Sequence, residues 1–401
     1  MKEVYYGFSD QVLTDSGGKM HIRFDSVSED DINNASSIDK IIEKDSIIID
    51  ITVEKEKIHE YILDLPKRKR IENRWFKISR NGDDLNAIFH NCNRAQNIPE
   101  NIKICNPRYL APTEDIFKKI LKIFKCPDQK TIPKALENEI SITSDPACVK
   151  CVNVGQGNCN IILNEEGCPL YYYDFGCRIG RDAKSYPIND DFCFPSTAFV
   201  VLSHWHLDHF INFKKHPDVL KLKWIVPPLG QYSIGKTHLE LIYNLMENNN
   251  LFLLDNQRQR LNTKHFEILS LKKWGTNKNN SGLVMFIKLP HEGSFNVLLP
   301  GDASYKHIPL GFNLNGLVAS HHGGRTCKND KFPSACPTRN IIAYSYGKDN
   351  IYKHPIQKVV ENLENAGWRN RYDTLVNGDI YIPQGTNAEK NHKVIKVYKQ
   401  I

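Results

Sequence analysis

Three histidines and an aspartate fall within six consecutive residues of this chain, in the order H-x-H-x-D-H. They follow an apolar run at residues 198–202 that is typical of a buried strand, so the polar cluster begins where a strand ends. In an extended segment His204 and His206 point to the same side, and Asp208 and His209 come directly after them. Imidazole and carboxylate are ligands for zinc, iron and manganese. The cluster therefore predicts a metal site on a rigid strand, and no other feature constrains the fold as much.

Other predicted strands end in residues of the same kind. One ends at Asp174, another at Asp302, a third at His321 and His322, and His354 follows a fourth. Each of these residues alone is more typical of an ordinary loop. Taken together, they indicate one site at the edge of packed sheets, where the ends of several strands meet.

The length of 401 residues allows two domains. We expect a small, β-rich N-terminal α+β domain of unknown role at residues 1–130, with strands at 20–24, 46–53 and 59–65. A proline-containing stretch at 131–147 is predicted to be a linker. The metal-type motifs all lie in the second predicted domain, residues 148–401.

Basic residues are unevenly distributed along the chain. Lys and Arg number 53 against 46 Asp and Glu, and the whole excess lies beyond residue 147. Residues 67–80 hold seven basic side chains and one acid around an aromatic pair, a composition that suits phosphate contacts and base stacking. A solvated strand edge has the same composition, so the sequence is compatible with both a nucleic-acid contact and a solvated edge. The candidate nucleic-acid contacts are Lys67, Arg68, Lys69, Arg70, Arg74 and, after the paired histidines, Arg325.

The chain shows no apolar run of eighteen residues and no signal-peptide core at its start, so we expect no membrane association. Its eleven cysteines are scattered and odd in number, which favours reduced thiols and a cytoplasmic protein. Cys148 and Cys151 form a lone C-x-x-C that we interpret as structural.

Seven motifs occur in a fixed order: VNVGQGN, YYYDFG, SHWHLDH, LLPGDA, ASHHGG, YKHP and GDIYI. In this order they resemble the metallo-β-lactamase domain of the ComEC/Rec2 family of competence proteins, over roughly residues 148–385. The resemblance implies an α/β fold of the αββα sandwich type, with two divalent metal ions, zinc or manganese, at the edge of its sheets. The family is thought to degrade DNA.

Matched motif by motif, the resemblance assigns the first metal to His204 and His206, and the second to Asp208, His209 and His321. Asp302 would bridge the two, and His322 is the alternative to His321. Asp208, His322 and His354 would be catalytic, with His354 in contact with the scissile phosphate or a metal. Asp174 would brace the site from behind. The third histidine of the superfamily has no match, and Asn280 and Ser281 stand in its place. Asn153 and Asn158 also replace aspartates that the family often has.

The favoured function is a nuclease or phosphodiesterase that cleaves DNA with a metal-activated water. One alternative is a hydrolase of a small phosphoester, ester or lactone. Another is a metal-binding component of a bacterial multi-protein assembly, such as one in anti-phage defence. The expected partner is nucleic acid. A protein partner that binds through the N-terminal domain is a second expectation.

Overall fold

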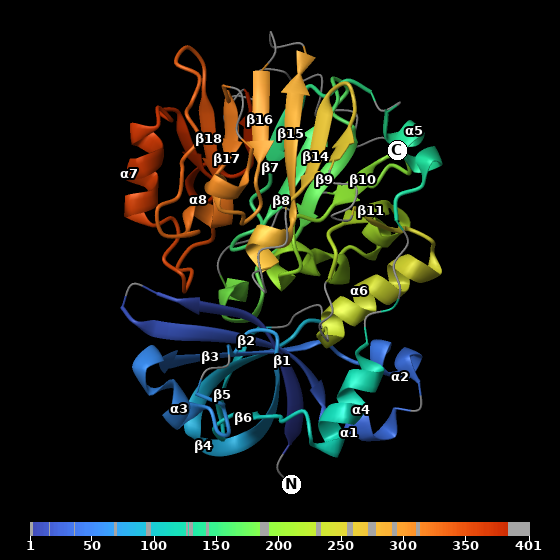
Figure 1. The fold of residues 1–401 in the computed structure, drawn as a ribbon, viewed down its shortest axis with the longest axis vertical. Helices are drawn as coiled ribbons and strands as arrows, with labels where there is room; N and C mark the ends of the chain where they lie inside the picture. The colour runs from blue at the N-terminus through green and yellow to red at the C-terminus, as the bar shows by residue number, and fades with distance from the viewer. Residues whose placement is uncertain are drawn as a thin grey trace. The chain divides into compact units, whose positions relative to one another are not determined.

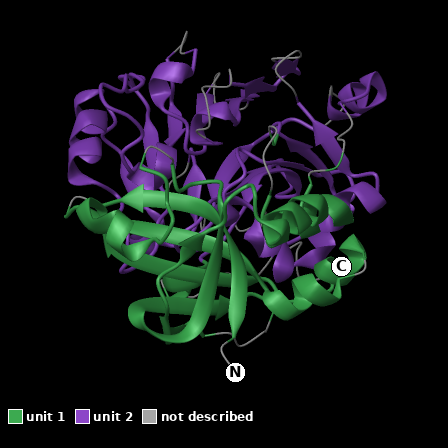
Figure 2. Ribbon diagram, turned by 60° about the horizontal axis from the view of Figure 1, so that its bottom comes forward, with its two compact units in different colours: residues 1–128, 179–184, 229–244 green, residues 129–178, 185–228, 245–401 purple. Residues whose placement is uncertain are grey.

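The computed structural model describes residues 3–15, 17–35, 37–67, 70–93, 98–125, 127, 131–141, 144–184, 192–229, 234–254, 260–271, 278–290, 295–309 and 313–383. The chain divides into two compact units (Figure 2). Unit 1 comprises Met1–Asp128, Ile179–Lys184 and Leu229–Asn244. Unit 2 comprises Gln129–Arg178, Ser185–Pro228 and Leu245–Ile401. Two short segments from the predicted second domain, residues 148–401, thus belong to unit 1, which the predicted boundaries did not foresee.

Unit 1 is built on a six-stranded antiparallel sheet, drawn in blue in Figure 1. β1 pairs with both β2 and β4, and β3 pairs with β2 and β4, so these four strands close into a small barrel. β5 and β6 both add to the long strand β4. The strands are β1 (Val4–Thr14), β2 (Lys19–Ser28), β3 (Ile47–Glu54), β4 (Trp75–Asn91), β5 (Glu100–Ile104) and β6 (Arg108–Tyr109).

The helices of unit 1 are short. Predicted strands 20–24 and 46–53 are confirmed as parts of β2 and β3, but the predicted strand at 59–65 is wrong. Apolar side chains at Ile58, Tyr61, Ile62 and Leu65 follow the spacing of a helix and pack on the barrel core, so α3 forms there. The helices are α1 (Glu29–Asn34), α2 (Ile38–Ile42), α3 (Ile58–Tyr61), α4 (Asp115–Ile123), the start of α6 (Lys236–Glu247), and the 3-10 turns η1 (Lys55–Lys57) and η2 (Gly180–Lys184).

Unit 2 contains two seven-stranded mixed sheets. The first has the order β12-β11-β10-β9-β8-β7-β20, and the second β13-β14-β15-β16-β17-β18-β19. The first sheet consists of β7 (Cys148–Cys151), β8 (Cys159–Leu163), β9 (Pro169–Phe175), β10 (Phe199–Val201), β11 (Lys223–Val226), β12 (Leu251–Leu253) and β20 (Ile380–Ile382). The second consists of β13 (Arg260–Asn262), β14 (Phe266–Ser270), β15 (Leu283–Leu289), β16 (Phe295–Leu299), β17 (Gly316–Val318), β18 (Ile341–Tyr344) and β19 (Arg371–Asp373).

The inner faces of the two sheets share one apolar core. Tyr171 and Val201 from the first sheet pack in the same cluster as Met285 and Val297 from the second. On its other face the second sheet packs against α7 (Gln357–Asn365), seen at its side in Figure 1. This arrangement confirms a mixed α/β fold with several sheets. The remaining elements of unit 2 are α5 (Lys134–Ser141), α8 (Thr374–Asn377), η3 (Leu207–His209), η4 (Ile211–Lys214), η5 (Pro217–Lys221), η6 (Lys278–Ser281), η8 (Tyr305–His307) and η9 (Ser320–Gly323).

The predicted linker at 131–147 differs from the structure. It contains α5, and Ile132, Leu136 and Ile140 are buried in the core between the two sheets. Helical spacing of these apolar residues is the physical reason, because it gives the segment one face to bury. The segment is therefore a structural part of unit 2.

Parallel strands in both sheets direct their carboxyl ends to the candidate site. β9, β10, β11 and β12 are parallel neighbours, and so are β16, β17, β18 and β19. Asp174 lies near the end of β9, and the H-x-H-x-D-H cluster follows β10. Asp302 follows β16, and the paired histidines follow β17.

Candidate metal centre

Six buried side chains from these strand ends form two adjacent groups of candidate ligands. Within each group, the ligand atoms lie within 4.8 Å of one another. The first group is His204, His206 and Asp302, and the second is Asp208, His209 and His322. Residues almost 100 apart in sequence thus meet as the strand-end pattern predicted.

The separations within the cluster suit metal coordination. Two ligand atoms bound to one tetrahedral ion at 2.0–2.1 Å lie about 3.3 Å apart. Nε2 of His204 is 3.6 Å from Oδ2 of Asp302, and Nε2 of His209 is 3.3 Å from Oδ1 of the same carboxylate. Nε2 of His322 is 3.5 Å from Oδ2 of Asp208. The two oxygens of Asp302 therefore face different histidines, as a bridging carboxylate would.

The outer nitrogen of several histidines is occupied, which leaves the inner nitrogen for a ligand. Nδ1 of His322 donates to the carbonyl of Ser345 at 2.8 Å, and Nδ1 of His209 donates to Oδ2 of Asp174 at 2.8 Å. Nδ1 of His204 lies 3.0 Å from Oγ of Ser203. Such outer hydrogen bonds set the tautomer and orientation of metal-binding imidazoles.

Four inward atoms have no hydrogen bond in the described part of the chain although they are buried. They are Oδ1 of Asp208, Oδ2 of Asp302, and Nε2 of His209 and His322. Burying polar atoms without partners is costly, and a divalent cation would compensate several of them at once. The residues present thus fit one or two metal ions.

Asp174 is hydrogen-bonded to residues of the cluster. Its carboxylate accepts from the backbone N–H and the hydroxyl of Ser203 at 2.6 and 2.8 Å, and from the amide of Asn158 at 2.8 Å. With the bond from His209, this buried carboxylate at the end of β9 is joined to Asn158, directly before β8, and to the loop that holds the H-x-H-x-D-H cluster. Sequence reasoning did not identify Ser203, and it noted Asn158 only as a departure from the family.

Charges inside the cluster shift its pKa values. Burial lowers the pKa of His204 well below its usual value. For His209, burial is outweighed by the Asp302 and Asp174 carboxylates, which raise its pKa well above the usual range. For Asp302, burial is outweighed by His209 and His321, which hold its pKa well below its usual value. Because histidine and carboxylate ligands must be deprotonated to bind a cation, metal binding at these residues would be accompanied by proton release.

The backbone is strained at the site. His321 and His322 both adopt left-handed conformations with φ of 52° and 56°, and Asp174 has φ of 62°. Non-glycine residues rarely adopt this conformation, and such strain concentrates at functional sites. Gly176 lets the loop with the H-x-H-x-D-H cluster pack closely against the end of β9, because a Cβ at Gly176 would lie 1.7 Å from the backbone oxygen of Asp208.

The paired histidines take different places. The sequence assigned the second metal to His321 with His322 as the alternative, and it is His322 that groups with Asp208 and His209. His321 lies beside them, with Nε2 3.6 Å from Oδ2 of Asp302. The two consecutive left-handed residues decide which ring joins the group, and sequence alone does not reveal them.

His354 also reaches the cluster, with its ring centroid 5.1 Å from that of His321. Burial, together with the nearby His321 and His322 rings, lowers its pKa well below the usual value. The backbone N–H of Gly347 donates to Oε1 of Gln156 at 3.4 Å, so the amide nitrogen of Gln156 faces Nδ1 of His354 at 3.5 Å. A side-chain amide nitrogen can only donate, so this contact favours the His354 tautomer with its proton on Nε2.

Asn280 and Ser281 lie in η6, next to the loop that carries Asp302. Oδ1 of Asn280 accepts from the backbone N–H of Ser304 at 2.9 Å, whereas the hydroxyl of Ser281 bonds within its own turn, to the carbonyl of Lys278. Asn280 thus supports the Asp302 loop.

The basic stretch at 67–80 is partly neutralised within unit 1. Lys77 pairs with Glu29 at 3.3 Å, and Arg80 pairs with Glu3 and Glu100 at 3.3 Å each. Lys67 and Arg70 are exposed, Arg74 is half-buried, and Arg68 and Lys69 lie outside the described residues. In unit 2, Arg325 is exposed three residues after His322.

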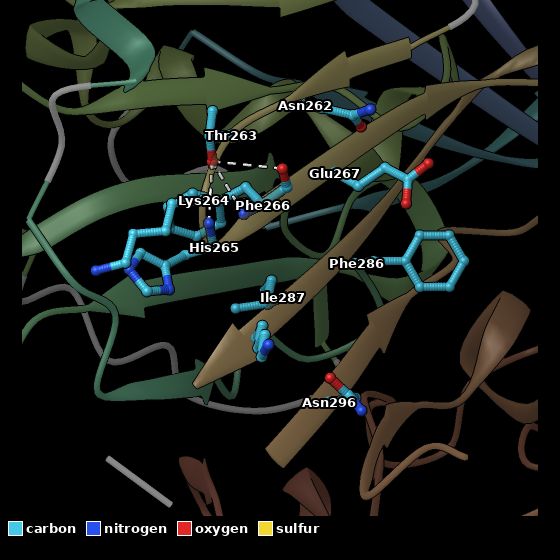
Figure 3. Close-up of a pocket in the computed structure, with 10 residues that line it drawn as sticks. Asn262, Thr263, Lys264, His265, Phe266, Glu267, Phe286, Ile287 and Asn296 are labelled. Carbon is cyan, nitrogen blue, oxygen red and sulfur yellow. Dashed lines mark hydrogen bonds between the residues drawn. The ribbon is translucent and has the colours of Figure 1, made fainter. Parts of the chain in front are cut away.

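No protein-family model matches this chain, and no curated protein matches it either. Within the described ranges, none of the helices has the length and apolar character needed to cross a membrane. A surface pocket lies at the turn between β13 and β14 (Figure 3). Thr263, His265 and Lys288 are among the residues that line it, and none of the candidate ligands does.

Proposed function

We propose that this protein is a metal-dependent hydrolase with a ComEC-like metallo-β-lactamase sandwich, and that it cleaves phosphodiester bonds in DNA. The observation that carries the proposal is the pair of buried His/Asp groups, which share the carboxylate of Asp302. Their position at the carboxyl ends of strands from two facing sheets supports the finer fold assignment.

The ligands suit two divalent ions, zinc or manganese, because they combine imidazole with carboxylate. His204 and His206 with Asp302 would hold one ion, and Asp208, His209 and His322 the other. When bound, the ions would supply a water of lowered pKa and a positive clamp on the phosphate.

In this proposal two side chains assist the reaction. Oδ1 of Asp208 is buried and makes no hydrogen bond in the described part of the chain, so it is available to orient a water. The contact between Nδ1 of His354 and the amide of Gln156 favours a proton on Nε2, from which His354 would donate to an oxygen of the phosphodiester in this proposal. His354 thus acts as a hydrogen-bond donor in this proposal, not as a metal ligand.

Charge near the site favours a polyanionic substrate. Exposed Arg325 and Lys328 follow the paired histidines, and exposed Lys215 follows the H-x-H-x-D-H cluster. By contrast, Lys221 and Lys223 pair with Asp218 and Glu139 and are less available. Flanking phosphates of a longer chain would meet the free cations.

The experiment compares substrates of different size. The protein, loaded with Mn²⁺ or Zn²⁺, is incubated with a length series of oligonucleotides and with bis-p-nitrophenyl phosphate. The proposal expects rates that rise with oligonucleotide length and fall with salt, because remote phosphate contacts position the scissile bond. Equal turnover of the small ester without a salt effect would favour a small-molecule hydrolase. Metal binding without turnover of any ester would favour a binding component of an assembly.

A further inference from the structure

Asp330 lies in the loop between η9 and β18 and accepts five hydrogen bonds. Its Oδ1 accepts from the hydroxyl of Ser304 at 2.9 Å and from the backbone N–H groups of Lys306 and Lys331 at 2.9 and 3.0 Å. Its Oδ2 accepts from the backbone N–H of Tyr305 at 3.2 Å and from the hydroxyl of Thr326. Asp330 lies outside all of the sequence motifs described above.

These bonds connect two loops that carry candidate ligands. Ser304, Tyr305 and Lys306 follow Asp302 directly, and Thr326 follows His322 by four residues. Three further hydrogen bonds join the loop of Asp302 to the loop of the paired histidines. The backbone N–H of His321 donates to the carbonyl of Gly301 at 3.0 Å, the hydroxyl of Ser320 donates to that of Ala303 at 2.7 Å, and the backbone N–H of Ser320 donates to the hydroxyl of Tyr305 at 2.8 Å.

The loop that Asp330 ties down contains the strained histidines. Two consecutive left-handed residues persist only where surrounding contacts hold them. A carboxylate fits this role because both oxygens accept, and three of the five donors are backbone N–H groups, which substitution cannot remove. An asparagine at position 330 would have only one accepting oxygen. In either orientation of its amide, the donors that now bond to Oδ1 or those that bond to Oδ2 would lose their acceptor.

We propose that Asp330 is a positioning residue that sets the spacing between Asp302 and the paired histidines, and hence the geometry of the metal centre. This inference rests on the metal-binding function proposed above. Asp330 itself does not touch the ions. It acts through the backbone on either side of them, as outer hydrogen-bond partners of metal ligands do.

The test uses cobalt(II) as the probe, because its visible absorption reports coordination geometry independently of activity. Full-length wild type, Asp330→Asn and Ser304→Ala are titrated with Co²⁺, and the unfolding midpoints of the metal-free proteins are measured alongside. The matched control is Asp218→Asn, which removes an exposed carboxylate that pairs with Lys221 at the surface. We expect Asp330→Asn to lose about 10- to 100-fold in cobalt affinity with altered absorption bands. Ser304→Ala should shift the same bands by less, and Asp218→Asn should match wild type.

The inference is overturned if Asp330→Asn lowers the unfolding midpoint but binds cobalt with wild-type affinity and spectrum, since its role is then structural only. If Asp330→Asn does not fold, Ser304→Ala decides, and an unchanged spectrum in that variant overturns the inference. If wild type itself binds no cobalt, the proposed metal-binding function is wrong, and the inference about Asp330 is wrong with it. If wild type binds cobalt and the variants equal it, this inference alone fails.

Discussion

Oδ2 of Asp174 lies 2.8 Å from Nδ1 of His209, and both side chains are fully buried. The carboxylate thereby fixes the ring so that Nε2 faces the centre, and it raises the pKa of His209 together with Asp302. We expect Asp174→Asn to weaken zinc or manganese affinity about 10- to 100-fold, because it removes this charge-assisted bond. Calorimetric titration checks the effect, with Asp218→Asn as the exposed control. Unchanged metal affinity in Asp174→Asn would show that Asp174 does not position His209 for metal binding.

The basic stretch gives a second prediction, about nucleic acid. Changing Lys67, Arg68, Lys69 and Arg70 to glutamine should weaken DNA binding and reduce its dependence on salt. Each lost phosphate contact should lower the log–log slope by about 0.7–0.9. Lys77→Gln is the matched control and should change the slope little, because Lys77 already pairs with Glu29. An unchanged slope in the quadruple variant would make the stretch a solvated edge.

A third prediction concerns acid stability. A hydrogen bond from Tyr6, followed by one from Lys77, lowers the pKa of Glu29 below its ordinary value of 4.5. A carboxyl group with a lowered folded-state pKa stabilises the fold above its unfolded pKa, and the contribution is lost as pH falls through the folded value. Wild type should therefore exceed Glu29→Gln in unfolding midpoint near neutral pH. The difference should shrink below about pH 4.5, and a pH-independent difference would show that ionisation of Glu29 is not its source.

Trp205 provides a fourth prediction. It lies inside the metal-type motif, but its ring is buried and its indole N–H donates to the carbonyl of Pro227 at 2.8 Å. Trp205→Phe should lower the free energy of unfolding by about 1–3 kcal/mol, because a buried acceptor loses its donor. Urea denaturation measures this change. DNA affinity per folded molecule should stay the same, and a selective loss of DNA affinity would instead assign Trp205 to base stacking.

The sequence predicted the candidate centre better than its surroundings. The H-x-H-x-D-H cluster, Asp174 and Asp302 were found because ligand-type residues follow apolar strands, and strand ends meet at a sheet edge. The choice between His321 and His322 depends on two left-handed residues, which no composition or spacing indicates. Asp330 accepts from three backbone N–H groups and from the hydroxyl of Ser304, and no composition or spacing in the sequence indicates these bonds. The helices α3 and α5 were missed although their apolar spacing was present, because each spans fewer than ten residues.

The boundary between the two units was also only partly predictable. Segments Ile179–Lys184 and Leu229–Asn244 join unit 1 through buried polar contacts far apart in sequence. Arg23 pairs with Asp50 at 2.9 Å and with Asp182 at 3.2 Å, and Asp25 accepts from the backbone of Thr237 at 2.8 Å. Such contacts depend on the folded chain and leave no periodic pattern.

The central claim is that the two His/Asp groups bind metal, and metal content measures it most directly. Wild type and the double variant Asp208→Ala/His209→Ala are saturated with Zn²⁺ or Mn²⁺, freed of excess, and assayed by mass spectrometry for ions per folded chain. We predict up to two ions in wild type, one fewer in the double variant, and loss of phosphodiester cleavage, with circular dichroism unchanged. A wild type without bound metal, or a double variant that keeps its full metal content and its rate, would contradict the account.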